Sequence, residues 1–307
     1  VYNLWEHRGP ILVASNFDGQ WPGLVGALGL EACLTRHAWT REQKGHSLLW
    51  SSEEFRDKDS VKKLKEWLAA GAITHDTSHA REFGQVDKAY AQALKSGEEA
   101  AADFRARPRI LGLYDPLCMG MINAAFDERD MAGLGIQLRR LSQSDLYSRM
   151  QDIPRAEALG YIKWLVDRGF KLEIGSNPFS EITEKSVIES GRMYAAMTRN
   201  LAEERMDGLG IAYQLGLAHL TSASDLAEAM LNSSDRPPVE YRGARVMPGE
   251  PIMCANEADM GCAVDQAMSK AIYRASSLPP RLWETTQHDV RWGDTYKGST
   301  KFTGKGK

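Results

Sequence analysis

Short apolar runs alternate with longer amphipathic stretches along the whole chain. The run ILVAS (11–15) predicts a buried strand, and a Gly-rich turn and a helix near 23–34 follow it. The same order recurs where HSLLW (46–50) precedes a helix that is expected to end at Gly71. Strands that alternate with helices of this kind are typical of βαβ units. The pattern therefore predicts an α/β fold with a parallel sheet and flanking helices.

The rest of the chain continues this alternation. A helix is expected over 154–169, where apolar residues recur at helical spacing and Gly169 gives a stop signal. The other expected helices lie near 86–105, 183–205, 223–232 and 260–275. The other expected strands are RILGLY (109–114), KLEIG (171–175), GLGIAYQ (208–214) and PIMCA (251–255). Pro and Gly mark expected domain breaks at 248–250 or 276–281.

Composition narrows the class of protein. Hydrophobic residues make up 43% and charged residues 26% of the chain, which is an ordinary globular balance. The net charge of −3 gives no general attraction to nucleic acid or to an anionic membrane. No apolar run reaches the roughly 20 residues of a membrane helix, and the N-terminus lacks a signal-peptide pattern. The four cysteines form no CxxC pair, which excludes a CxxC-type zinc site and favours a reduced, cytoplasmic protein.

A Gly-rich turn follows the first predicted strand in SNFDGQWPGLVGALG (15–29). It contains neither GxGxxG nor GxxxxGK[ST], so a nicotinamide oxidoreductase lacks its cofactor motif here. Trp21 lies at the end of this strand, where open α/β sheets bind their ligands, and is a candidate for substrate binding. The alternative is a tight turn in which Trp21 packs on its own domain.

Three further polar segments contain candidate functional residues. HDTSH (75–79) has two histidines at helical metal-pair spacing, but its polar surroundings favour a solvated loop. Asp225 and Glu228 lie just inside a predicted helix, and S-x-x-D at 222–225 is a capping signal, so both acids are interpreted as capping residues. Gln214 differs, because it ends an apolar strand where a polar side chain can face a crevice.

Two acids stand where a buried strand meets a helix in CANEADMGC (254–262). Glu257 and Asp259 could both be helix caps. A second acid-bearing segment, TTQHDVRWG (285–293), contains Asp289. Carboxylates from two such segments could also converge on one divalent cation, and such oxygen ligands suit Mn²⁺. The residues alone leave capping and metal binding open.

Several stretches recur together, in order, in one known family. They run from near residue 9 to near residue 294 and are SNFDGQWPGLVGALGLEACLT, YDPLCMGMINAAF, LSQSDLYSRM, GIAYQLGL, SASDLAEAMLN, NEADMGCAVDQAM and TTQHDVRWG. On these stretches the chain resembles the L-fucose/L-arabinose isomerase family, in particular its fucose isomerase-like branch.

The resemblance implies a homo-oligomeric, Mn²⁺-dependent aldose–ketose isomerase that acts on an open-chain sugar through a cis-enediolate. Glu257 and Asp289 fall on the family's metal-binding Glu and Asp, one of which would be the base, and Gln214 falls near a substrate-contacting Gln. The implied organisation is one or more Rossmann-like α/β domains over 1–276. Residues 277–307 would begin a mainly β C-terminal domain.

The chain also departs from the family. Nothing precedes Val1 that matches the family's first domain, and no histidine follows Asp289 to match its third ligand. His288 is not expected to substitute, because neighbours on a strand point to opposite faces. The expectation is that a separate C-terminal segment supplies this histidine. The competing interpretation is a non-catalytic sugar-binding or assembly subunit that kept the fold without a complete site.

Overall fold

The computed structural model describes residues 7, 9–16, 23–36, 46–51, 53–78, 80, 90–115, 126–177, 181–214 and 216–278, without the side chains of 23–25. The chain divides into two compact units, one within Val1–Gln85 and one within Val86–Gln287. The expected break at 248–250 is wrong, because this segment forms a turn inside the second unit. The segment expected to begin a C-terminal domain at 277 lies almost wholly outside the described residues.

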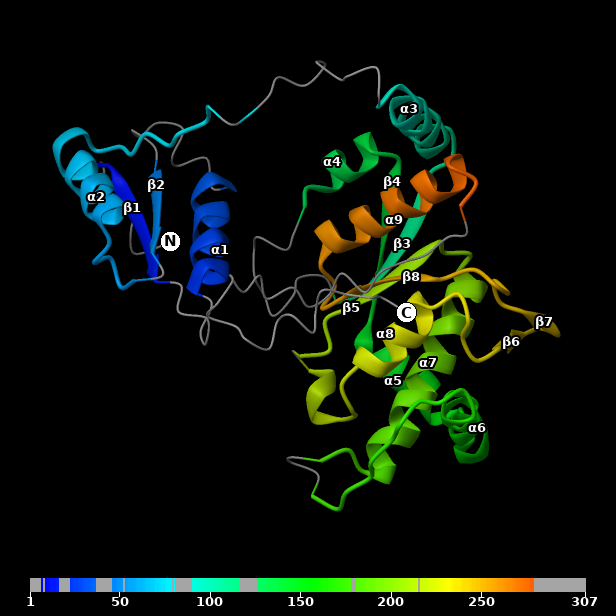
Figure 1. Cartoon of the computed structure of the whole chain (residues 1–307). Coiled ribbons are helices and arrows are strands. Elements are labelled where there is room, and N and C mark those ends of the chain that lie inside the picture. Colours follow the sequence, from blue (N-terminus) through cyan, green and yellow to red (C-terminus); the bar gives the residue numbers. More distant parts are fainter. Residues whose placement is uncertain are drawn as a thin grey trace. The chain divides into compact units, whose positions relative to one another are not determined.

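The first unit contains a parallel pair of strands joined through a helix. Its elements are β1 (Ile11–Asn16), α1 (Gly23–Arg36), β2 (His46–Ser51) and α2 (Lys58–Ala70) (Figure 1). The register places Ile11 opposite His46 along the pair. Val13 and Leu34 are buried between β1 and α1, so the expected βαβ arrangement is confirmed here.

Local signals set both ends of α2. The Asp57 carboxylate accepts a hydrogen bond from the Ser60 amide at 2.7 Å and caps the first turn. Gly71 follows the last residue of α2 in the left-handed conformation, with φ of 72°. The expected stop at Gly71 is therefore confirmed.

The second unit is built on a four-stranded sheet in which every pairing is parallel. Its strands are β3 (Arg109–Tyr114), β4 (Ile136–Leu141), β5 (Gly208–Ile211) and β8 (Met253–Asn256), in the order β4-β3-β5-β8. The chain first moves outward from β3 to β4 and then returns to the other side of β3 with β5. The carboxyl ends of β3 and β5 thus form a topological switch point, where ligands of such sheets bind.

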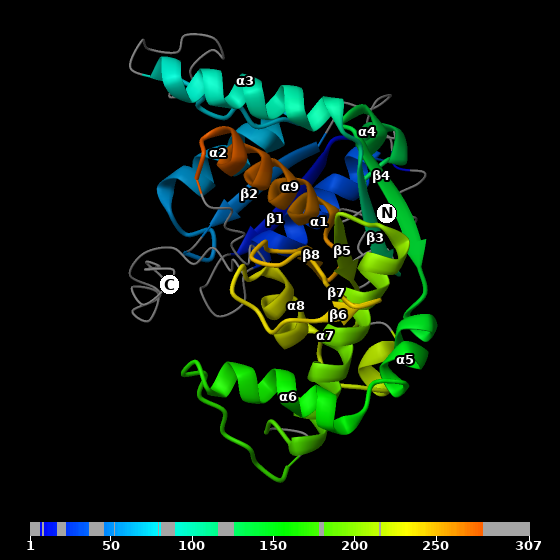
Figure 2. The ribbon, with the colours of Figure 1, turned by 90° about the vertical axis from the view of Figure 1, so that its right-hand side faces the viewer.

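Helices cover both faces of this sheet, as Figures 1 and 2 show. One face carries α3 (Ala91–Ala106), α4 (Glu128–Gly133) and α9 (Met260–Ala275). The other carries α5 (Gln143–Gln151), α7 (Glu184–Glu204) and α8 (Asp225–Asn232), and α6 (Arg155–Val166) packs against α7. Along β3, Leu111 and Leu113 pack on the first face and Tyr114 on the second. This alternation buries both faces of the strands, and it confirms the predicted α/β fold with a helix-flanked parallel sheet.

Three differences from the expected elements have physical reasons. KLEIG (171–175) is not a strand, because its apolar side chains find no core and Ile174 is 54% exposed. Strand β5 ends at Ile211, so Gln214 lies in the turn that follows it. Strand β4 was not predicted, because it is an edge strand in which the exposed Gln137, Arg139 and Arg140 occur on both faces and interrupt the apolar pattern.

Two small elements complete the described part of the second unit. A two-stranded antiparallel ribbon joins β6 (Glu240–Tyr241) to β7 (Ala244–Arg245), and a short 3₁₀ turn covers Leu217–His219. Among the helices described above, none is long and apolar enough to cross a membrane.

Candidate active site at the carboxyl end of the sheet

The carboxyl ends of β5 and β8 bring Gln214 and Glu257 together. The two strands are neighbours, with Ile211 opposite Asn256, so the turns that follow them leave the sheet side by side. The Gln214 amide Nε2 donates a hydrogen bond to Glu257 Oε1, and both side chains are partly buried. Two side chains 43 positions apart in the chain therefore meet at the predicted crevice.

The backbone at Glu257 adopts a conformation that non-glycine residues rarely use. Glu257 has φ of 52° and Ala258 has φ of 55°, both in the left-handed region. Each such residue costs on the order of 1 kcal/mol and persists only where the surroundings enforce it, often at functional sites. This turn directs the Glu257 carboxylate toward Gln214.

Asp259, rather than Glu257, caps helix α9. The Asp259 carboxylate accepts hydrogen bonds from the amides of Gly261, at 2.8 Å, and Cys262, at 3.3 Å. The two alternatives for this segment are thus divided between two residues. Capping accounts for Asp259, and it leaves the carboxylate of Glu257 to be explained by its contact with Gln214.

Glu228 is fully buried directly behind this turn. Ser224 Oγ donates to its Oε1, and Asn256 Nδ2 donates to its Oε2 at 2.8 Å. The expected capping signal at 222–225 is wrong. The Ser222 hydroxyl contacts Ser190 Oγ. Ser224, which is the N-cap residue of α8, makes no side-chain hydrogen bond to the helix backbone. The Ser224 hydroxyl donates its proton to the buried Glu228 carboxylate, in a charge-assisted hydrogen bond.

Three carboxylates give this end of the sheet a negative potential. The pKa of the Tyr213 hydroxyl rises to about 12, first because of burial and then because of the charges of Asp225, Glu257 and Glu228. The tyrosine therefore stays protonated at neutral pH and is a hydrogen-bond donor beside these acids. Sequence reasoning missed Tyr213, and only its position directly before Gln214 could have indicated it.

Several predicted site residues lie outside the described part of the chain. Asp289, His288 and Trp21 are among them, so their convergence with Glu257 stays a prediction. In HDTSH, residues 75–78 are exposed loop and turn, as expected, and His79 is not described. Across the described ranges, no group of three or more His, Cys, Asp or Glu side chains could hold a metal ion.

At this site the Glu257 carboxylate is an oxygen ligand of the kind that Mn²⁺ accepts. Gln214 Oε1 is buried and has no hydrogen-bond partner among the described residues, so it can accept a hydrogen bond from a bound ligand. The carboxylate fits the chemistry of the ion but does not complete its coordination. The second carboxylate assigned by the resemblance, Asp289, would have to extend the set.

Comparison of the chain with protein-family models yields no match, and comparison with curated proteins yields none either. An assignment of activity to this chain therefore depends on its sequence motifs and on the geometry of Gln214 and Glu257.

Proposed function

We propose that this chain forms part of a Mn²⁺-dependent aldose–ketose isomerase that acts on an open-chain sugar. The single observation that carries the proposal is the contact between Gln214 and Glu257 at the carboxyl end of a parallel sheet. This is the edge where α/β sheets bind ligands. The sequence motifs predict that Gln214 contacts the substrate and that Glu257 binds the metal. The role of helix cap, which competes for Glu257, is taken by Asp259.

Each residue has a defined task in this proposal. Gln214 fixes the Glu257 carboxylate through its Nε2 and leaves its buried Oε1 free to accept a hydrogen bond from a sugar hydroxyl. Glu257 and Asp289 hold Mn²⁺, which when bound polarises the sugar carbonyl as a Lewis acid. One of the two carboxylates removes the proton from C2 of the aldose and returns it to C1, while the proton of the C2 hydroxyl passes to the C1 oxygen. Trp21 contributes to the substrate pocket.

The proposal includes what lies outside the described residues. A histidine from a separate segment would provide the third protein ligand, and the active form would be a homo-oligomer. Candidate substrates are L-fucose, L-arabinose, D-arabinose and modified hexoses, which share the open-chain aldehyde and the adjacent hydroxyl on which the reaction depends.

The direct experiment is an isomerisation assay on a panel of aldoses. Residues 1–307 are assayed alone and within the product of the complete reading frame, each with and without added Mn²⁺. We expect ketose to form from at least one aldose in the complete product, and only with a divalent ion. Sugar binding without turnover would instead favour a sugar-binding or assembly subunit.

A further inference from the structure

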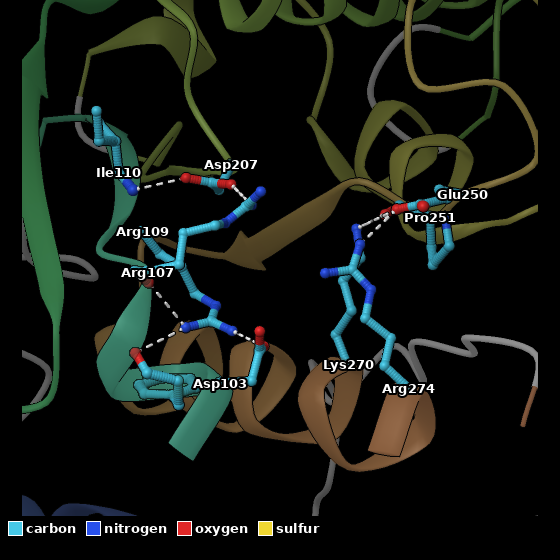
Figure 3. A network of polar contacts seen from close by, with 10 residues as sticks. Asp103, Arg107, Arg109, Ile110, Asp207, Glu250, Pro251, Lys270 and Arg274 are labelled. Carbon is cyan, nitrogen blue, oxygen red and sulfur yellow. Dashed lines mark hydrogen bonds and ion pairs between the residues drawn. The ribbon is translucent and has the colours of Figure 1, made fainter. Parts of the chain in front are cut away.

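A second polar cluster lies at the opposite, amino end of the same sheet (Figure 3). Arg109 begins β3, Asp207 directly precedes β5, and Lys270 and Arg274 project from α9 beside the start of β8. Together with Arg107 they line a cavity of about 30 Å³ whose apolar lining includes Met253 and Ala271. We name this cavity the amino-end pocket.

Positive charge is in excess around the amino-end pocket. Arg107 pairs with Asp207, Arg109 pairs with Asp103 at 2.9 Å, and Glu250 serves both Lys270, at 3.1 Å, and Arg274, at 2.9 Å. Four cations thus share three carboxylates, and only one of these carboxylates, that of Asp207, lines the cavity itself.

Two of the cations are removed from water. The side chains of Arg109 and Lys270 are 6% and 7% exposed. Burial lowers the pKa of Lys270, and its contacts with Glu250 oppose that shift. A buried cation that shares an acid with a second cation is stabilised when an anion approaches.

Several N–H groups of the cations at the amino-end pocket have no acceptor among the described contacts. Lys270 Nζ donates to Pro251 O, at 3.0 Å, and to Glu250, which leaves one of its N–H groups over among the described contacts. Arg274 contacts Glu250 through Nη2, and Arg107 contacts Asp207 through Nη2, so most of both guanidinium forks is available. Guanidinium and ammonium donors in this arrangement are those that recognise phosphate oxygens.

We propose that the amino-end pocket binds a phosphate group, either as free inorganic phosphate or as the phosphate of a larger ligand. The cavity has room for about two water-sized groups, so two phosphate oxygens enter it and the rest stays at its mouth. The Lys270 ammonium and the Arg274 and Arg107 guanidinium groups supply the contacts. The site lies at the other end of the sheet from Gln214 and Glu257 and does not depend on the proposed isomerase activity.

The test is calorimetric titration of the intact chain at constant ionic strength, with chloride as the balancing ion. The two probes are inorganic phosphate and glycerol phosphate. Saturable binding of both identifies a site for the free anion, and binding of the ester alone identifies a site for a larger phosphorylated ligand. Saturation by neither probe overturns the proposal.

Variants link the binding to the named side chains. Arg274→Gln removes one charge-assisted hydrogen bond at a half-exposed position and is expected to weaken binding about tenfold. Lys270→Met is expected to abolish it, with circular dichroism as the check on folding. The matched control is Lys163→Met, which removes an exposed lysine that pairs with Asp167 on α6. Equal affinity in the Arg274→Gln and control proteins would contradict the assignment.

Discussion

The buried carboxylate of Glu228 links helix α8 to the end of strand β8. Asn256 donates to one oxygen of its carboxylate and Ser224 to the other, and Asn256 directly precedes the strained turn at Glu257. The turn that presents Glu257 to Gln214 is therefore supported by the buried Glu228 carboxylate, through Asn256.

Glu228→Gln tests this support. The variant keeps the volume of the side chain but places an NH₂ group opposite a donor, which leaves one buried group unsatisfied. We expect the free energy of unfolding in urea to fall by about 1–3 kcal/mol. In the control, Glu184→Gln, an exposed ion pair with Arg155 is lost and the change is expected to be below about 1 kcal/mol. Equal effects of the two substitutions would show that the Glu228 contacts contribute nothing.

Gln214→Ala tests the substrate contact. It removes the orphan oxygen Oε1 and the donor to Glu257 while leaving the carboxylate itself in place. A hydrogen bond to a neutral sugar hydroxyl is worth about 0.5–1.5 kcal/mol, so we expect kcat/KM to fall several-fold with the Mn²⁺ content unchanged. Steady-state kinetics together with metal analysis measure both. Unchanged kinetics would make Gln214 a structural residue only.

The two acids at this site differ in how far the sequence predicts them. Glu257 follows an apolar run and is visible as an acid at a strand end. Glu228 has the pattern of a helix-capping acid, and its burial depends on α8 packing against β8, a contact between segments far apart in the chain. Helical periodicity carries no information about that contact.

At the scale of elements, the hydrogen bonds that cap helix α2 lower the pKa of its N-cap residue, Asp57. Hydrogen bonds from Ser60 and Ser51 hold the pKa of the Asp57 carboxyl at about 2, below its ordinary value of 3.8. A lowered pKa in the folded state contributes stability that is present above the unfolded value and is lost as the pH falls through the folded value.

Asp57→Ala is therefore expected to lower the melting temperature at neutral pH. The difference from the unsubstituted protein should shrink as the pH falls from 3.8 toward 2, because the unfolded chain takes up the Asp57 proton first and the folded carboxylate, which forms the charged cap, is protonated only near pH 2. Thermal melts followed by circular dichroism at several pH values measure it. Asp59→Ala, in the same turn but paired with Lys63, is the control. A difference that stays constant over this pH range would contradict the capping role.

Elements with local signals are the ones that the sequence predicts well. Helices α2, α7 and α9 have clear caps or periodicity, and α9 extends over 260–275, where it was expected. The exposed run 171–175 and the edge strand β4 differ from their patterns, because a strand exists only where a neighbour pairs with it.

At the scale of the whole molecule, the chain contains two units with separate cores. We expect differential scanning calorimetry to resolve two transitions, with the larger enthalpy in the transition of Val86–Gln287, because unfolding enthalpy scales with the number of residues. A single transition with equal calorimetric and van't Hoff enthalpies would contradict this expectation.

The boundary between the units and the order of the strands were beyond sequence reasoning. Alternating strands and helices predict a parallel sheet, but the same pattern is compatible with one unit or two. The order β4-β3-β5-β8 depends on pairing between strands that are far apart in the sequence, which local patterns do not specify. This order places the switch point beside Gln214.

The role of Glu257 as a metal ligand is tested most directly by comparing Glu257→Gln with Asp259→Ala in the product of the complete reading frame. Both acids lie in one turn, but Asp259 caps α9 and Glu257 contacts Gln214. We expect Glu257→Gln to stay folded and to lose Mn²⁺ and isomerase activity. Asp259→Ala should keep both and lose about 0.5–2 kcal/mol of stability. Full turnover and Mn²⁺ content in Glu257→Gln would show that Glu257 is not a ligand of the metal.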